Sequence, residues 1–295
     1  KKFLKKMHNL IFEMEKIASE AKKRELPKIL ICNMLKEYLH YFVLDFIYNS
    51  ADFKDMVFYG GSSLRMLFDL PRLSEDIDFE ADENLSLADL AKALESYFKK
   101  DLALQEKFQV NKMRTINRIF LKLPVLYEVG LSPHKGEVLV VKVEARPLEK
   151  SFFNNLKISL TPISKHGRSF VVRHYDLPTL FASKIPAILG RGKRGFKKGK
   201  IEEGINFKGR DFYDLIWYME QGVIPDSLML KKKEITKSLK EIFDEIENFV
   251  ANNKNFQKGL AGDLQPLFVS AGFVDVFSKN FLEIFQRARK DKYNL

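Results

Sequence analysis

Two aspartates separated by one residue, Asp76 and Asp78, could hold a metal ion together. They lie in the segment DIDFEA, whose alternation of acidic and apolar residues predicts a strand. Successive side chains on a strand point to opposite faces, so both carboxylates face one side while Ile77 and Phe79 face the core. At roughly 7 Å and an effective dielectric of about 20, the two charges repel by about 2 kcal/mol. A divalent cation reverses that sign, and Mg²⁺ suits carboxylate oxygens while leaving positions for phosphate oxygens.

A double glycine precedes this segment and indicates a phosphate site. The residues DMVFYG predict a strand ending near Tyr59, and SSLRMLFDL predicts a short helix after Gly60 and Gly61. The first turn of a helix leaves backbone N–H groups that attract anions, and glycine lets a phosphate approach closely. The Ser62 hydroxyl and the Arg65 guanidinium are further phosphate candidates. Separately, a glycine pair is typical of turns and D-x-D of solvated strands; together they favour metal-assisted nucleotidyl transfer.

The apolar pattern predicts an α+β (α/β) fold: a mixed β-sheet flanked by helices, followed by a helical domain. Residues 1–50 carry two helical patterns, and the second, from Pro27, is apolar on most sides, so we expect it to pack on the sheet. Residues 51–175 form the α/β core, with a helix over 87–104 capped by Ser86. Its further strands are expected at RIFLKLPVLY, EVLVVKVEARP and SFVVRHY.

After residue 175 the pattern is helical only, so residues 176–295 form the predicted C-terminal domain. Asp176 can cap a helix that runs to Leu189. The other helices are expected at residues 210–221, 231–252, 256–270 and 274–290.

The charge balance indicates a polyanionic partner. The net charge is +11, and lysine and arginine occur in clusters, as in proteins that contact nucleic acids. Cys32 is the only cysteine and the five histidines lack zinc-ligand spacing, so we expect a reducing compartment without disulfide or zinc chemistry. No apolar run reaches the roughly 18–20 residues of a membrane span. We therefore expect a cytoplasmic protein without membrane contact.

The glycine and aspartate motifs resemble those of a known superfamily. Gly61-Ser62, thirteen residues, then Asp76-Ile77-Asp78 resembles the signature of DNA polymerase beta type nucleotidyltransferases, and GGSSLRMLFDLPRLSEDIDF is similar to the AbiEii/AbiGii toxin family, over about residues 59–218. This resemblance implies an enzyme of type IV toxin–antitoxin or abortive-infection systems. It implies transfer of an NMP from an NTP to RNA, expected to be the tRNA 3′ end, which blocks translation. It also implies Mg²⁺, in a one- or two-metal arrangement with Mn²⁺ as a substitute, and a cognate antitoxin.

The resemblance implies further site residues. Glu144, in the strand VVKVEARP, would be a third metal-facing acid. Lys184 would bind the triphosphate, Asp211 would be an additional catalytic carboxylate, and Arg210 beside it would contact the nucleotide. Alternatives stay open, since Glu144 can pair with a basic neighbour on its strand, and an acid such as Asp211 is favoured in any first helical turn by the helix dipole.

The sequence departs from the family pattern at a long basic segment, RGKRGFKKGKIEEGINFKGR, between Arg191 and Arg210. Either Arg191 and Lys193, or Lys208 and Arg210, could occupy the basic positions before Asp211. The segment could be a solvated loop or a flap that binds a polyanion. Two other functions stay open: nucleotidyl transfer to a small-molecule or protein hydroxyl, and a nucleotide- or RNA-binding module without catalysis. The NTP, the acceptor and the oligomeric state are not readable from the sequence.

Overall fold

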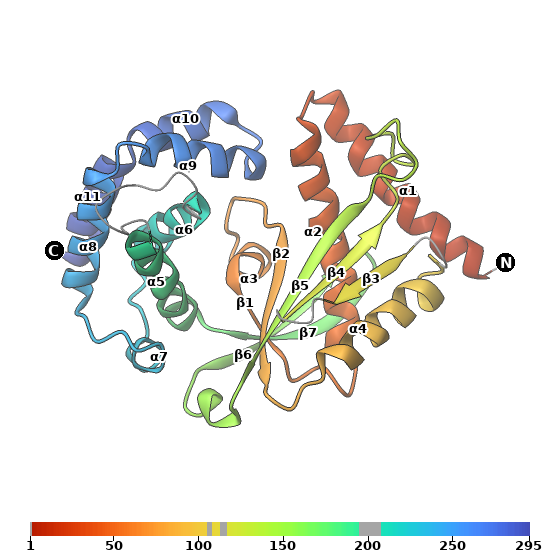
Figure 1. The fold of residues 1–295 in the computed structure, drawn as a ribbon, viewed down its shortest axis with the longest axis horizontal. Coiled ribbons are helices and arrows are strands. Elements are labelled where there is room, and N and C mark those ends of the chain that lie inside the picture. The colour runs from red at the N-terminus through yellow and green to blue at the C-terminus, as the bar shows by residue number, and fades with distance from the viewer. Residues whose placement is uncertain (1, 105–107, 113–116, 195–207) are drawn as a thin grey trace. The chain divides into compact units, whose positions relative to one another are not determined.

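The computed structural model describes residues 2–104, 108–112, 117–194 and 208–295, with the backbone alone for residues 2–9, 112 and 191–194 (Figure 1). The chain divides into two compact units. The first comprises Lys1–Asn154 and Ile158–His174, and the second comprises Asn155–Lys157 and Tyr175–Leu295.

The first unit contains four α-helices and seven strands among its described residues. Their bounds are α1 Lys2–Lys23, α2 Lys28–Tyr48, β1 Val57–Tyr59, α3 Gly60–Leu67, β2 Asp76–Asp82, α4 Leu87–Ser96, a π-helical turn Tyr97–Asp101, β3 Gln109–Lys112, β4 Arg118–Leu123, β5 Leu139–Leu148, a 3-10 turn Lys150–Phe153, β6 Ile158–Lys165 and β7 Arg168–Tyr175. Ser86 caps α4 as expected, because its side chain accepts a hydrogen bond from the Asp89 backbone N–H.

The strands form one mixed sheet in the order β3-β4-β5-β2-β1-β7-β6. β2 pairs parallel with β5 and antiparallel with β1, and β1 pairs parallel with β7. The α+β fold class is therefore confirmed. The sheet centre holds β2, and its neighbour β5 carries Glu144, while its other neighbour β1 leads directly into α3, which carries the predicted phosphate-binding residues.

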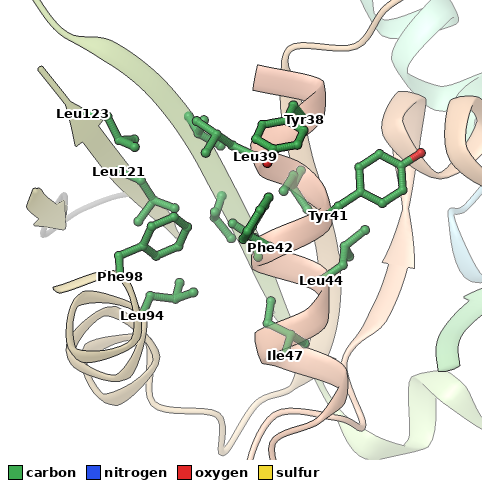
Figure 2. Packing of buried hydrophobic residues seen from close by; sticks show 14 of the residues in the cluster. Tyr38, Leu39, Tyr41, Phe42, Leu44, Ile47, Leu94, Phe98, Leu121 and Leu123 are labelled. Atoms are coloured by element: carbon green, nitrogen blue, oxygen red, sulfur yellow. The ribbon is translucent and has the colours of Figure 1, made fainter. Parts of the chain in front are cut away.

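Helix α2 covers one face of the sheet, as its apolar sequence predicts. Figure 2 shows Leu39 and Phe42 of α2 facing Leu121 of β4, with Phe98 beside them, and these side chains belong to one buried cluster. Ile77 and Phe79 of β2 belong to the same cluster and are fully buried. Because strand residues alternate, the neighbouring aspartates of β2 face the opposite side of the sheet.

The described part of the second unit is helical apart from short connections. Its helices are α5 Leu177–Arg194, α6 Gly209–Glu220, α7 Ser227–Lys232, α8 Leu239–Asn252, α9 Phe256–Leu264 with a 3-10 turn Gln265–Leu267, α10 Ala271–Lys279 and α11 Phe281–Tyr293. Their apolar faces meet in rows of aromatic rings, such as Phe212 of α6 against Phe256 and Phe281 with ring centroids 5.0 and 6.0 Å apart.

Two long helices expected in this unit are each split in two. The predicted helix over 231–252 is interrupted at Glu234, whose φ is +60°, and α8 starts afresh from a capping box of Ser238 and Glu241. The predicted helix over 274–290 ends and restarts at Asn280, which follows α10 and precedes α11. Polar residues that compete for backbone hydrogen bonds account for both breaks.

Candidate active site on the open face of the sheet

The carboxylates of Asp76 and Asp78 lie on one face of β2, as their spacing predicts. The register of β2 with β5 places Asp76 opposite Lys142 and Asp78 opposite Glu144. Neighbouring residues in register point the same way, so all four side chains share this face of the sheet. The side chains of Asp76 and Glu144 are 22% and 27% exposed, so both reach the surface of the sheet.

The glycine turn brings the chain against Asp78. Gly60 has φ +81°, a conformation that glycine adopts without steric cost. A Cβ at this position would lie 2.6 Å from Asp78 Oδ2, closer than any contact can be. The absence of a side chain at Gly60 therefore lets the Asp78 carboxylate sit directly against the turn that opens α3.

The first turn of α3 is open to an anion. Its N-cap residue, Tyr59, makes no side-chain capping hydrogen bond, so the leading backbone N–H groups are not capped by that residue. Ser62 is buried, and its hydroxyl donates to the backbone carbonyl of Asp76. That hydroxyl is therefore engaged in tying α3 to β2, and the predicted phosphate contacts at this turn are chiefly backbone groups.

Arg65 points to a different set of partners. Its Nε lies 3.1 Å from Glu37 Oε2 on α2, and its Nη1 donates to the Leu70 carbonyl at 3.1 Å. These contacts fix the end of α3 against α2. A nucleotide contact by Arg65 stays a prediction that requires this guanidinium to exchange partners.

The carboxylates on the open face are matched by two cations. Lys142 Nζ lies 2.7 Å from Asp76 Oδ2 and 3.9 Å from Glu144 Oε2. Arg118, on β4, donates from Nε to Glu144 Oε2 at 2.7 Å, and this hydrogen bond raises the pKa of the Arg118 guanidinium above its ordinary value. Of the two basic residues beside Glu144 on its own strand, Lys142 and Arg146, Lys142 lies 3.9 Å away, but the closest partner is Arg118 from the adjacent strand.

The donor atoms suit a hard divalent cation, because carboxylate oxygens face one side of the sheet. Asp76 also binds a cationic group there, the Lys142 ammonium. Within the described residues, however, no three acidic, histidine or cysteine side chains converge as a preformed metal site. Asp76 and Asp78 are the residues that would hold the ion. Glu144 would reach it only by loosening its pair with Arg118, and its metal role remains a prediction.

The second unit holds the other predicted site residues. Lys184 of α5 lies between two acids of α6, with Nζ 2.9 Å from Asp211 Oδ1 and 2.8 Å from Asp214 Oδ2. Asp214 is fully buried, and the Asp211 side chain is 6% exposed. Asp211 is thus part of a buried ion cluster as well as a first-turn residue. Arg210 donates its backbone N–H to Asp263 at 2.9 Å.

The basic segment before α6 falls largely outside the described residues, since 195–207 are not placed and 191–194 have backbone only. Whether Arg191 and Lys193 or Lys208 and Arg210 occupy the family's basic positions therefore stays open.

Two cationic residues of the first unit were missed from the sequence. Arg118 could have been found, because alternation in RIFLKL puts it on the face opposite Ile119. Arg72 could not: it follows a proline in a loop, yet it is 2% exposed, and its Nη2 lies 2.6 Å from where a Gly61 Cβ would be. Its Nη1 donates to the Leu73 carbonyl at 2.9 Å, so it supports the loop that delivers the chain into β2.

A mixed sheet with two aspartates beside a left-handed glycine at a helix start is the arrangement expected of a nucleotidyltransferase. The family model of the AbiEii nucleotidyl transferase toxins of type IV toxin–antitoxin systems matches residues 42–271. The chain belongs to this family and is a nucleotidyltransferase. Membership implies an NTP substrate and a cognate antitoxin.

Comparison with solved structures gives distant likenesses. A candidate nucleotidyltransferase of H. pylori is 14% identical, with 88% of this chain and 96% of that chain covered and a TM-score of 0.47. JHP933 from Helicobacter pylori is also 14% identical, with coverage of 89% and 95% and a TM-score of 0.43. An antigenic nucleotidyltransferase-like protein from Paracoccidioides brasiliensis is 16% identical, covering 79% and 91%, with a TM-score of 0.35. No curated protein matched the chain.

Among the described residues, no helix combines the length and the apolar character needed to cross a membrane.

Proposed function

We propose that this nucleotidyltransferase uses Mg²⁺ to transfer an NMP from an NTP to the 3′ end of an RNA, with tRNA as the acceptor, and thereby blocks translation. The observation that supports the proposal is the close approach of the Gly60 turn to the Asp78 carboxylate, because the helix start that we propose for phosphate binding then lies beside a pair of acids. The net charge of +11 supports a nucleic-acid acceptor over a small neutral one.

In the first unit, the start of α3 and the two aspartates of β2 have different proposed roles. The N–H groups at the start of α3 would bind the β- and γ-phosphates, since a helix N-terminus attracts anions. Asp76 and Asp78 would hold the metal, with Mn²⁺ able to replace Mg²⁺ and a second ion arriving with the nucleotide. When bound, the metal would neutralise phosphate charge and favour the deprotonated acceptor hydroxyl.

The transfer itself is a substitution at the α-phosphorus. The acceptor oxygen bonds to this phosphorus, the bond to the pyrophosphate oxygen breaks, and the hydroxyl proton passes to a carboxylate or to water. Glu144 is a candidate for orienting that hydroxyl, because Arg118 and Lys142 hold its carboxylate on the open face. Roles of Lys184 and Arg210 in nucleotide binding, and of Asp211 in catalysis, are proposed from family membership.

The test is transfer from each α-³²P-labelled NTP to total tRNA by the purified protein, with Mg²⁺, with Mn²⁺ and with EDTA. We expect one nucleotide to label tRNA in either metal and none in EDTA. Label appearing on protein or on a small molecule while RNA stays unlabelled would replace the proposed acceptor. Binding of nucleotide without any transfer, by calorimetry, would indicate a binding module instead.

A further inference from the structure

The open face of the sheet extends beyond the carboxylates onto β4. In the antiparallel register of β4 with β5, Arg118 lies opposite Glu144 and Phe120 lies opposite Lys142. The intervening residues of β4 are buried in the core, so Arg118, Phe120 and Lys122 all face the same side as the aspartates. We refer to these three residues as the β4 platform.

The β4 platform has the composition of a site for unpaired nucleotides. The Phe120 ring is half-buried between two cationic side chains on its own strand. With the Asn111 amide oriented so that its oxygen faces β4, Lys122 Nζ lies 3.0 Å from that oxygen, which holds the ammonium group at the surface. Aromatic rings flanked by cations bind single strands by base stacking and phosphate contacts.

The direction of the reaction favours the acceptor as the occupant. In an in-line displacement, the entering and leaving oxygens lie on opposite sides of the α-phosphorus. The glycine turn follows β1 on one side of β2, and β5 and β4 lie on the other side. With the leaving pyrophosphate at the Gly60 turn, the acceptor hydroxyl approaches from the side of β5 and β4.

We propose that the β4 platform binds the unpaired 3′-terminal nucleotides of the RNA acceptor, with a base stacked on Phe120 and a phosphate held by Lys122. This inference rests on the proposed function, because it takes the triphosphate to lie at the glycine turn. It adds that the enzyme requires a single-stranded 3′ end, since a base inside a duplex is already stacked on its neighbours and is held in place by its complementary strand.

The test uses a fluorescent RNA hairpin with a short single-stranded 3′ overhang and the same hairpin with a blunt end. Anisotropy gives the affinity for each, and steady-state transfer gives KM for RNA and for NTP. We expect Phe120→Ala to weaken binding of the overhang RNA by about 10-fold and to raise KM for RNA equally, while KM for NTP is unchanged. Phe120→Trp restores binding, and Lys122→Gln weakens it with a shallower dependence on salt.

Controls separate stacking from folding. Phe120→Leu keeps an apolar side chain on the strand without a planar ring. It should therefore match the wild-type melting temperature but bind overhang RNA more weakly than wild type, as Phe120→Ala does. Phe12→Ala removes a ring that is 61% exposed on α1 and should leave both KM values unchanged.

The possible failures are distinguishable. If wild type transfers to RNA and Phe120→Ala keeps its KM for RNA, the platform is wrong and the proposed function stands. A raised KM for NTP would assign Phe120 to the nucleotide, and equal affinity for blunt and overhang RNA would exclude stacking; either overturns the inference. If wild type transfers nothing to RNA, the proposed function fails. The β4 platform then stands only if anisotropy shows that Phe120→Ala loses affinity for the overhang RNA, and it fails otherwise.

Discussion

At the scale of single residues, the site depends on how closely Gly60 and Asp78 approach. The left-handed backbone at Gly60 and the lack of a Cβ are both needed, because one allows the turn and the other leaves room for the carboxylate. Asp76 is held differently, by the ammonium group of Lys142 on the neighbouring strand. The two acids therefore make distinguishable contributions.

Removing either carboxylate should abolish transfer. Asp76→Asn and Asp78→Asn are each expected to lower kcat/KM for labelled tRNA by at least about 100-fold, because loss of a direct metal ligand exceeds the effect of losing an outer partner. The matched control is Asp82→Asn, at the far end of β2, where the carboxylate accepts from the backbone N–H and the side-chain amide of Asn84. Equal activity of all three variants would remove the pair from the mechanism.

A methyl group at Gly60 should damage the site beyond its cost in backbone strain. Gly60→Ala and Gly167→Ala both force alanine into a left-handed conformation, which costs about 1–2 kcal/mol of unfolding free energy in each. Only at Gly60 does the new Cβ meet a neighbour, Asp78 Oδ2 at 2.6 Å, whereas nothing lies within 4 Å at Gly167.

We therefore expect Gly60→Ala to lose metal-dependent transfer, and Gly167→Ala to keep it despite a similar fall in melting temperature. Melting curves and the tRNA-labelling assay check this pair. Full activity of Gly60→Ala would mean that Asp78 can move aside without consequence.

At the scale of elements, α5 and α6 are joined by a charge cluster rather than by apolar contacts alone. Lys184 is 13% exposed and lies between the buried carboxylates of Asp211 and Asp214. Breaking a buried pair by removing one partner leaves an uncompensated charge, which is usually more costly than the pair was worth. This cluster must therefore be counted in stability as well as in catalysis.

Substitution of Lys184 should lower the unfolding free energy, and replacing its two carboxylate partners by neutral amides should restore part of that loss. Lys184→Met is expected to lower the unfolding free energy by about 3–5 kcal/mol, and the triple variant that also carries Asp211→Asn and Asp214→Asn should recover part of it. The control, Lys240→Met, breaks an exposed pair with Asp244 and should cost less than about 1 kcal/mol. Urea titrations measure all three, and a neutral Lys184→Met would contradict the cluster's structural role.

The elements that the sequence predicted well are those with strong periodicity. The apolar helix α2, the strands β2, β4 and β5, and the cap of α4 follow directly from alternation or capping residues. Strands β3 and β6 were not anticipated, because β3 spans four residues and β6 is an edge strand with a proline and several polar residues. The turn, the aspartate pair and their shared face could be predicted; the pairing of Glu144 with Arg118 required the sheet register.

At the scale of the whole molecule, a buried histidine beneath the site should make stability depend on pH. His40 of α2 is 1% exposed, and its burial lowers the pKa to about 3 from the ordinary 6.5, although the nearby Asp76 charge and the backbone of Glu75 act in the opposite direction. Among the described residues, its Nε2 has no hydrogen-bond partner. The folded protein therefore keeps His40 neutral.

The sign follows from proton uptake. Below pH 6.5 the unfolded chain binds a proton at His40 that the folded chain refuses until about pH 3, so this residue lowers stability as the pH falls. The contribution is about 1.4 kcal/mol per pH unit within that window. His40→Asn should flatten the dependence of the unfolding free energy on pH between about 6.5 and about 3, where the unfolded chain carries this proton and the folded chain does not. His134→Asn, on an exposed loop, should not, and identical slopes in both variants would contradict the burial argument.

The chain passes between the two units three times, after Asn154, Lys157 and His174, rather than once. The short segment Asn155–Lys157 clusters with the helical unit, and there the Lys157 carbonyl accepts from the Asp176 backbone N–H at 3.4 Å. A recombination event with a single crossover at residue 175 would thus pair these three residues with a foreign set of helices. A crossover upstream of this segment would instead separate β7 from its sheet partner β1, so an exchange that keeps both units intact must replace Asn155–Lys157 together with the C-terminal helices and retain β6 and β7.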